Sequence, residues 1–267
     1  MKTGEITCQS ILGRSEIGGM DYAVNPYLGC SHACCYCYAR FMTRLGHVGE
    51  AWGSFVDAKV NAVEKLRGEV KKKPHGRTLL SSVTDPYQPI ERQYKLTRGC
   101  LEVLQDNGFR VDILTKSNLV LRDLDIIGKF NEIEIGLTLT AMDDRVRVAF
   151  EPGASTVQER LDALKKISDQ GIPTYAFVGP LLPYLSEERL EDLFNALADR
   201  VNRVIVDRLN IKCGNMPAIR YVLQKNYPEI QPLFEAALSS KSEYYPALKK
   251  HVAQICLERE IPADILF

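Results

Sequence analysis

Three cysteines in one short segment are the residues of this chain best suited to do chemistry. Cys30, Cys34 and Cys37 have the spacing C-x₃-C-x₂-C within residues 25–40. Thiolates spaced in this way on one loop can each bind an iron of a cubane iron–sulfur cluster, which normally takes four cysteines. A loop with three cysteines therefore leaves the fourth iron open to a ligand that is not protein.

An open iron beside a reducible cluster is what reductive cleavage of S-adenosylmethionine (SAM) requires. The methionyl amine and carboxylate chelate that iron, and one electron breaks the sulfonium C–S bond to give a 5′-deoxyadenosyl radical. The cysteine spacing, with the aromatic Tyr36 just before the last cysteine, resembles the signature of the radical SAM superfamily. The resemblance implies a [4Fe-4S] cluster held by Cys30, Cys34 and Cys37, with SAM as a second cofactor.

A disulfide framework and a structural zinc site are the alternatives for these cysteines. A disulfide framework suits a small secreted domain, whereas this chain has 267 residues and residues 1–10 lack the apolar segment of a secretory signal. A zinc site needs four ligands, usually in two separated pairs. His32 or Cys35 would have to complete the set from inside the loop, where they would crowd the other three. A non-catalytic iron–sulfur or zinc-binding module stays open as an alternative function.

The composition is typical of a cytoplasmic enzyme, and we expect that location. The chain has 34 Lys and Arg against 34 Asp and Glu, and 45% of its residues are hydrophobic, enough to bury a core. Eight cysteines fit a reducing compartment if three of them bind iron. No apolar run approaches the roughly 18 residues that span a bilayer, so no membrane partner is expected. Zero net charge gives no general case for nucleic-acid binding, although nucleic acid stays possible as a substrate.

The elements that must position the cysteine loop alternate along the chain. Short apolar segments and amphipathic segments follow one another, the pattern of βα units and a parallel sheet. A short strand is expected within residues 1–24, residues 23–27 lead into the cysteine loop, and further strands bring the number to about six. Those strands are expected at 78–83, 111–115, 133–140, 172–178 and 203–207, with helices at 58–72, 96–107, 119–130 and 155–170.

About six βα units that begin after such a cysteine loop match the partial (β/α)₆ barrel of radical SAM enzymes. The resemblance therefore implies an α/β fold in three parts. An N-terminal extension covers residues 1–24, a partial barrel of parallel strands covers 25–210, and a C-terminal helical extension covers 211–267, with helices at 218–224 and 244–260. Side chains at the C-terminal ends of the parallel strands would face the active site.

Further segments resemble one branch of the superfamily, which contains spore photoproduct lyase. They are residues 25–40, 82–91, 115–118, 138–140, 151–154 and 179–183. Spore photoproduct lyase has a cysteine just after its second core strand as a hydrogen-atom donor. Residues 81–85 here read Ser-Ser-Val-Thr-Asp, and a serine O–H bond is too strong to replace a thiol. We therefore expect an unknown substrate rather than a thymine photoproduct.

The resemblance also implies roles for side chains at strand ends. The residue at the position of Tyr36 lies near the adenine of SAM, and the related lyase has a lysine near the SAM carboxylate where this chain has Lys116. Thr138 and Thr140 alternate on one face of a strand and would reach the ribose or the amino acid moiety. The expected cofactor-binding residues are Tyr36, Ser82, Thr84, Asp85, Lys116, Thr138, Thr140 and Arg160.

Each of these roles has a structural alternative. Asp85 precedes a proline, and Asp-Pro commonly opens a turn. Lys116 would by default be an exposed lysine, and Tyr38 would pack around the cluster. Arg160 lies one helical turn into its helix, where an ion pair with Glu151 is the alternative to cofactor binding.

The expected catalytic residues are Cys213, Tyr36 and Tyr38. Cys213 follows the sixth strand, so its position favours it to bring a thiol to the barrel mouth; an idle free cysteine is the alternative. The two tyrosines flank Cys37, and their phenols would act on the substrate directly. The expected electron donor is of the flavodoxin or ferredoxin type.

A peptide- or protein-modifying radical SAM enzyme is the second hypothesis for the function. Such enzymes often carry additional cluster-binding cysteines in a C-terminal extension. Beyond residue 210 this chain has Cys213 and Cys256, which counts against that hypothesis.

Overall fold

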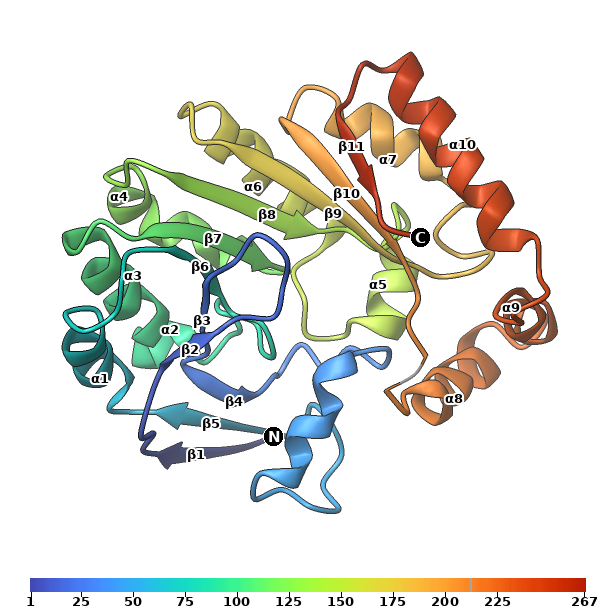
Figure 1. Ribbon diagram of the computed structural model, residues 1–267. Helices are drawn as coiled ribbons and strands as arrows, with labels where there is room; N and C mark the ends of the chain where they lie inside the picture. The colour runs from blue at the N-terminus through green and yellow to red at the C-terminus, as the bar shows by residue number, and fades with distance from the viewer. Residues whose placement is uncertain (212) are drawn as a thin grey trace.

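An eight-stranded sheet forms the centre of the computed structural model, which describes residues 1–211 and 213–267 (Figure 1). The strand order is β11-β10-β9-β8-β7-β6-β3-β2, so β2 and β11 are its edges. Every neighbouring pair from β3 to β11 is parallel, and β2 is antiparallel to β3. The strands are β2 (Leu12–Arg14), β3 (Tyr22–Val24), β6 (Arg77–Leu80), β7 (Arg110–Thr115), β8 (Ile133–Thr138), β9 (Thr174–Leu181), β10 (Arg203–Arg208) and β11 (Ala263–Ile265).

Helices between successive strands cover the outer face of this sheet (Figure 1). Strands covered by helices need apolar side chains along their length. This requirement explains the short apolar segments of the sequence. Leu104, Leu164 and Leu193 from three helices join Ile113 and Ile135 from two strands in one buried core. The helices on this face are α1 (Ala62–Glu69), α2 (Glu91–Tyr94), α3 (Leu96–Asp106), α4 (Leu124–Ile127), α6 (Val157–Ser168), α7 (Leu190–Leu197) and α10 (Tyr244–Glu258).

A second, three-stranded sheet combines the N-terminal strand with two strands that lie between β3 and β6 in the sequence, and it carries the cysteine loop. Its order is β1-β5-β4, with β1 (Lys2–Ile6) parallel and β4 (Tyr27–Gly29) antiparallel to β5 (Phe55–Lys59). The short 3₁₀ helix η1 (Tyr38–Arg44) follows the loop. The helix expected at 58–72 is therefore wrong at its start, because residues 55–59 form β5 and α1 begins at Ala62. The run Phe55–Lys59 is too short for periodicity to separate a strand from a helix, and pairing on both sides made it a strand.

The expected α/β fold built on parallel strands is confirmed, and six of these strands, β3 and β6–β10, pair in chain order. Residues 119–130, expected to be mostly helix, form the 3₁₀ helix η2 (Asn118–Asp123) and the single turn α4. After β10 come α8 (Met216–Asn226), α9 (Gln231–Ala237) and α10, as expected of a helical extension, but β11 adds a seventh parallel strand. The division of the chain at residues 24 and 210 stays a prediction.

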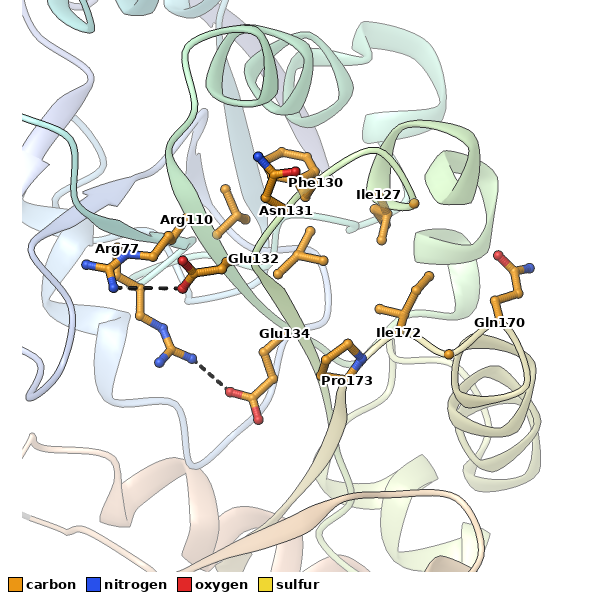
Figure 2. A pocket seen from close by; sticks show the side chains of 14 residues that line it. Arg77, Arg110, Ile127, Phe130, Asn131, Glu132, Glu134, Gln170, Ile172 and Pro173 are labelled. Carbon is orange, nitrogen blue, oxygen red and sulfur yellow. Dashed lines mark hydrogen bonds and ion pairs between the residues drawn. The ribbon is translucent and has the colours of Figure 1, made fainter.

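Polar side chains form a ladder across the N-terminal ends of the strands, far from the cysteine loop. Arg77 pairs with Asp112 and Glu134, both at 2.8 Å, and the Tyr175 hydroxyl donates to Asp112 at 2.8 Å. A Cβ at position 136 would overlap the Tyr175 ring, so glycine at this position leaves room for that ring. A cavity of about 500 Å³ opens at this end (Figure 2). In parallel α/β barrels this end contributes to stability, whereas chemistry occurs at the opposite end.

No helix in the described part of the chain has an apolar stretch long enough to cross a membrane.

Candidate active site

The cysteine loop connects β4 to η1 through two consecutive turns. The Ala33 N–H donates to the Cys30 carbonyl at 3.3 Å, and the Cys37 N–H donates to the Cys34 carbonyl at 3.1 Å. Gly29, with φ of +83°, precedes the first turn in a conformation that other residues rarely adopt. The thiols of Cys30 and Cys34 are buried, whereas Cys37 is partly exposed.

Neighbouring segments hold this loop by its backbone. The Cys35 N–H donates to the Phe150 carbonyl at 3.0 Å, at the end of α5 (Asp144–Phe150), and the Gly153 N–H donates to the His32 carbonyl at 3.1 Å. A Cβ on Gly153 would overlap the Ser31 carbonyl. Glycine at 153 therefore allows the two backbones to touch.

Thr84 and Gln88, which follow β6, hold the start of the loop. The Thr84 hydroxyl donates to the Gly29 carbonyl at 2.5 Å, and the Gln88 side chain accepts from the Ser31 N–H at 2.9 Å. Gln88 also donates to Thr84 Oγ1 at 2.9 Å. The hydroxyl of Thr84 is thus engaged with the loop backbone, and the buried Gln88, not assigned a role from the sequence, completes that contact.

Asp85 links the cysteine loop to the end of β7. Its carboxylate accepts from the Thr115 hydroxyl at 2.6 Å and from the Lys116 N–H at 2.8 Å, and it lies 3.2 Å from His32 Nδ1. Burial by itself would raise the pKa of Asp85, but His32 and these donors lower it to about 2. Asp85 therefore stays ionised, and the Asp-Pro turn expected as its alternative role is present through a bond from the Tyr87 N–H at 2.9 Å.

The three thiols share one electrostatic environment. Burial raises the pKa of Cys30 to about 12, with further contributions from Asp85 and Cys37. Burial raises the pKa of Cys34 well above its usual value, and Cys37 and Cys30 add to that increase. Burial also raises the pKa of Cys37. Three neighbouring thiolates need compensating cations, so this donor set fits an iron–sulfur cluster.

Cys35 lies in a different environment from its three neighbours. Burial raises its pKa to about 12, and the charges that act on it are those of Glu151 and Arg40. No three His, Cys, Asp or Glu side chains of the described residues gather as ligands of a single metal ion. A cubane separates its protein ligands, because each cysteine binds a different iron.

A buried network anchors Tyr36 at the ends of β8 and β9. The Tyr36 hydroxyl donates to Glu151 and lies 3.2 Å from Thr140 Oγ1, which donates to the same carboxylate at 2.7 Å. Arg160 pairs with Glu151 at 2.7 Å and donates to the Thr138 carbonyl at 2.6 Å. The ion pair considered as an alternative for Arg160 is therefore present, with both side chains fully buried.

The charges around Glu151 keep it ionised. Burial would raise its pKa, but Arg160, then Lys116 and the two hydroxyl donors, lower it to about 2. The Lys116 ammonium lies 5.8 Å from the centre of the Tyr36 ring. Burial would lower the pKa of Lys116, but the charges of Cys34, Glu151 and Asp85 raise it. Lys116 is thus a cation facing the cysteine loop and the Tyr36 ring.

Ser82 and Tyr38 meet at the end of β6. Asn25 Oδ1 accepts from the backbone N–H groups of Ser82 and Val83, at 2.9 and 3.0 Å. The Tyr38 hydroxyl donates to the Ser82 carbonyl, while its ring is about half exposed. Tyr38 is therefore tied to the end of β6 through its hydroxyl while part of its side chain stays exposed.

Cys213 lies near the cysteine loop, partly exposed. Its thiol contacts the Asn210 carbonyl at 3.7 Å, and its charge is among those that raise the pKa of Cys37. The buried Asn215 amide donates to the Tyr36 carbonyl at 2.6 Å. The sequence carries no signal for Asn215, because its partner lies 179 positions away.

The structure thus gathers residues from many elements around the cysteine loop, while their cofactor-binding and catalytic roles stay predictions. Glu151, His32 and Asn25 lie inside segments that the sequence singled out, although no site role was assigned to them. They join the expected residues Cys30, Cys34, Cys37, Tyr36, Tyr38, Ser82, Thr84, Asp85, Lys116, Thr138, Thr140, Arg160 and Cys213.

Comparisons with known proteins agree with this site. Residues 24–197 match the Radical SAM superfamily. An uncharacterized protein of Methanocaldococcus jannaschii is 37% identical over 225 residues, which cover 84% of this chain and 83% of that protein. A radical SAM Nα-GlyT isomerase of Pseudomonas phage M6 is 27% identical over 206 residues, 76% of this chain and 42% of the phage protein.

A solved structure of spore photoproduct lyase, a double mutant with bound AdoMet and dinucleoside spore photoproduct, has the same fold. Its TM-score is 0.70 at 18% identity, covering 98% of this chain and 81% of that one. Radical SAM enzymes use a [4Fe-4S] cluster and SAM, and the assignment of Cys30, Cys34 and Cys37 as the ligands of that cluster stays a prediction. The chain belongs to the radical SAM superfamily and has the fold of spore photoproduct lyase.

Proposed function

We propose that this enzyme reductively cleaves SAM and directs the 5′-deoxyadenosyl radical at a C–H bond of its substrate. The observation that carries this proposal is the convergence of three buried or half-buried thiols with Lys116 at the end of β7. When bound, the cluster supplies one electron to the sulfonium, which separates into methionine and the radical. The protein supplies binding, orientation and electrostatics.

The side chains of the site divide these tasks between them. Cys30, Cys34 and Cys37 would hold three irons. The Lys116 ammonium would pair with the SAM carboxylate, and the Tyr36 ring, fixed by its bonds to Glu151 and Thr140, would lie beside the adenine. Because the Tyr36 hydroxyl is engaged with these partners, its ring is held in place before SAM arrives.

Replacing Lys116 with alanine is expected to weaken SAM binding by about tenfold or more, because a hydrogen bond to a charged group contributes about 1.5–3 kcal/mol. The measurement is equilibrium dialysis of labelled SAM against anaerobically reconstituted protein. Lys225→Ala, on the exposed side of α8, serves as the control and should bind SAM like the wild type. An unchanged affinity in Lys116→Ala would remove this lysine from the SAM site.

The reaction that we propose for this chain differs from that of the structurally similar lyase. Nucleic acid is the substrate class that we propose, since the lyase structure with the same fold holds a dinucleoside spore photoproduct. The segment that would carry a donor thiol has serines instead. Ser81 is buried and donates to the Val24 carbonyl at 3.2 Å, and the Ser82 N–H is bonded to Asn25. We therefore propose a reaction other than repair of thymine photoproducts.

Supplied with dinucleoside spore photoproduct, SAM and dithionite, the wild-type enzyme is expected to release little or no repaired thymine. The product radical would find no thiol donor at Ser82 or Val83. Thymine release is measured by liquid chromatography, with 5′-deoxyadenosine counted in the same samples to show that the enzyme is active. Efficient repair that disappears in Cys213→Ala would instead identify Cys213 as the donor, and efficient repair in both proteins would identify Tyr36 or Tyr38.

A further inference from the structure

One guanidinium in the segment after the cysteine loop has a buried nitrogen without a partner. Nη1 of Arg40 is buried and has no hydrogen-bond partner among the described residues. Arg160 and Arg200 also leave one buried nitrogen bare, but another of their nitrogens pairs with Glu151 or Asp199. A guanidinium does not lose its proton in proteins, so burial without an acceptor is costly. Arg40 therefore has N–H donors left for a group that carries negative charge.

The local helix places this guanidinium on the side of the last cysteine of the loop. Cys37 is the N-cap of η1, and Arg40 follows three positions later. Side chains three positions apart lie above one another in a 3₁₀ helix. The two residues between them differ in surroundings, since Tyr38 is about half exposed and Ala39 is buried. Arg40 thus extends from the same side of η1 as the Cys37 thiol.

The charges of the loop agree with this placement. Burial raises the pKa of Cys37, whereas a bond from the Ala39 backbone and the charges of Lys116 and Arg40 lower it. Burial also raises the pKa of Cys35, and the charge of Arg40 acts against that increase. Lys116 lies over the Tyr36 ring and is the proposed partner of the SAM carboxylate. Arg40 is the second cation near Cys37, and the proposed function gives it no role.

A cation beside an iron–sulfur cluster changes how readily the cluster accepts an electron. Three thiolates make the bound cluster anionic, and reduction adds one further negative charge. A fixed positive charge therefore stabilises the reduced form more than the oxidised form, because the Coulomb energy grows with the product of the charges. Net charge and hydrogen bonds to the sulfur atoms both set the reduction potential of such clusters.

We propose that Arg40 presents its unpartnered N–H donors and its positive charge to the sulfur atoms of the cluster beside Cys37, and so raises the reduction potential of the cluster. In the reduction itself, a low-potential donor loses one electron and the cluster gains it, while Arg40 keeps its protons and its charge. The inference rests on the proposed function and adds the residue that makes its first electron transfer easier. The SAM carboxylate and a substrate phosphate are the other anions that a guanidinium binds, but the placement beside Cys37 favours the cluster.

A redox titration of anaerobically reconstituted protein, without SAM, tests this inference. Dithionite and mediator dyes set the ambient potential, and electron paramagnetic resonance counts the reduced cluster. Arg40→Gln is expected to lower the ratio of reduced to oxidised cluster about tenfold at the potential where half of the wild-type cluster is reduced, a shift of about 59 mV to lower potential. Arg40→Lys keeps the charge and should recover most of this loss.

Arg44→Gln is the matched control, because it removes the same charge from the same 3₁₀ helix. The Arg44 side chain is exposed, and its guanidinium lies 5.2 Å from the centre of the Phe41 ring. Solvent and salt screen an exposed charge, so this variant should keep the wild-type potential. Equal potentials in wild type and Arg40→Gln would overturn the inference, and so would equal shifts in Arg40→Gln and Arg44→Gln.

Iron and sulfide content is measured first in each variant. If Arg40→Gln holds no cluster, Arg40→Lys decides the question: a cluster with the wild-type potential supports the inference, and a missing cluster overturns it. An unchanged potential with weaker SAM binding in Arg40→Gln would assign the guanidinium to the SAM carboxylate instead. An unchanged potential with weaker oligonucleotide binding would assign it to a phosphate.

The proposed function is tested separately, because the titration contains no SAM. A potential that shifts in Arg40→Gln, in a protein that forms no 5′-deoxyadenosine with dithionite, would contradict the proposed function and still support the role of Arg40. Formation of 5′-deoxyadenosine by the wild type, with equal potentials in wild type and Arg40→Gln, would support the function and contradict that role.

Discussion

Replacing Cys30, Cys34 or Cys37 with alanine is expected to abolish both the [4Fe-4S] cluster and SAM cleavage. Each thiol would hold a different iron, and the loop that carries them is fixed by its own turns and by bonds to neighbouring segments, so we expect no other thiol to take the vacated place. Iron and sulfide content, the visible absorption of the cluster, and 5′-deoxyadenosine formed with dithionite are the measurements. All three should fall to background in each variant.

Cys35→Ala is the matched control within the same loop. Cys35 is held through its backbone N–H, which alanine retains, and its side chain lies in an apolar cluster with Phe150 and Leu182. The variant should therefore keep the cluster and cleave SAM. Tetrahedral zinc bound by all four thiols, or loss of the cluster in Cys35→Ala alone, would contradict the proposed ligands.

Arg160→Met is expected to lower the free energy of unfolding by about 3–5 kcal/mol, because removing one partner of a buried ion pair leaves an uncompensated charge. Glu151 would remain buried, with the Tyr36 and Thr140 hydroxyls as its remaining hydrogen-bond partners. Urea unfolding followed by circular dichroism measures the change. Methionine retains most of the volume of the arginine stem, so the loss reports the charge rather than a cavity.

A double variant tests whether the charge is the cause. Arg160→Met with Glu151→Gln should be more stable than Arg160→Met alone, since replacing both partners removes the uncompensated charge. Lys165→Met, on the same helix but in an exposed pair with Asp169 at 3.0 Å, should cost no more than about 0.5 kcal/mol. A loss below about 1 kcal/mol in Arg160→Met would show that Glu151 is stabilised by its other neighbours.

The sequence was most informative where the deciding interactions are local. The cysteine spacing covers eight residues, and the turns that present the thiols are closed by bonds between residues three apart. The strands at 111–115 and 203–207 were recognisable as short apolar runs, because strands of a sheet covered by helices must be apolar along their length. The start of the helix expected at 155–170 is likewise set by local bonds, since Thr156 and Glu159 bond each other's backbone within one turn.

Tertiary structure decided the contacts between distant residues. Residues 58 and 59, the end of β5, were included in an expected helix because the identity of β5 depends on its pairing with β1 and β4. Strand β11 became visible only once it paired with β10. Tyr36 meets Glu151 across 115 positions and Asn215 across 179, distances at which sequence periodicity carries no information. The sequence alone therefore determined the parallel βα plan and the spacing of the three cysteines, whereas the network that fixes Tyr36 follows from how the folded elements pack.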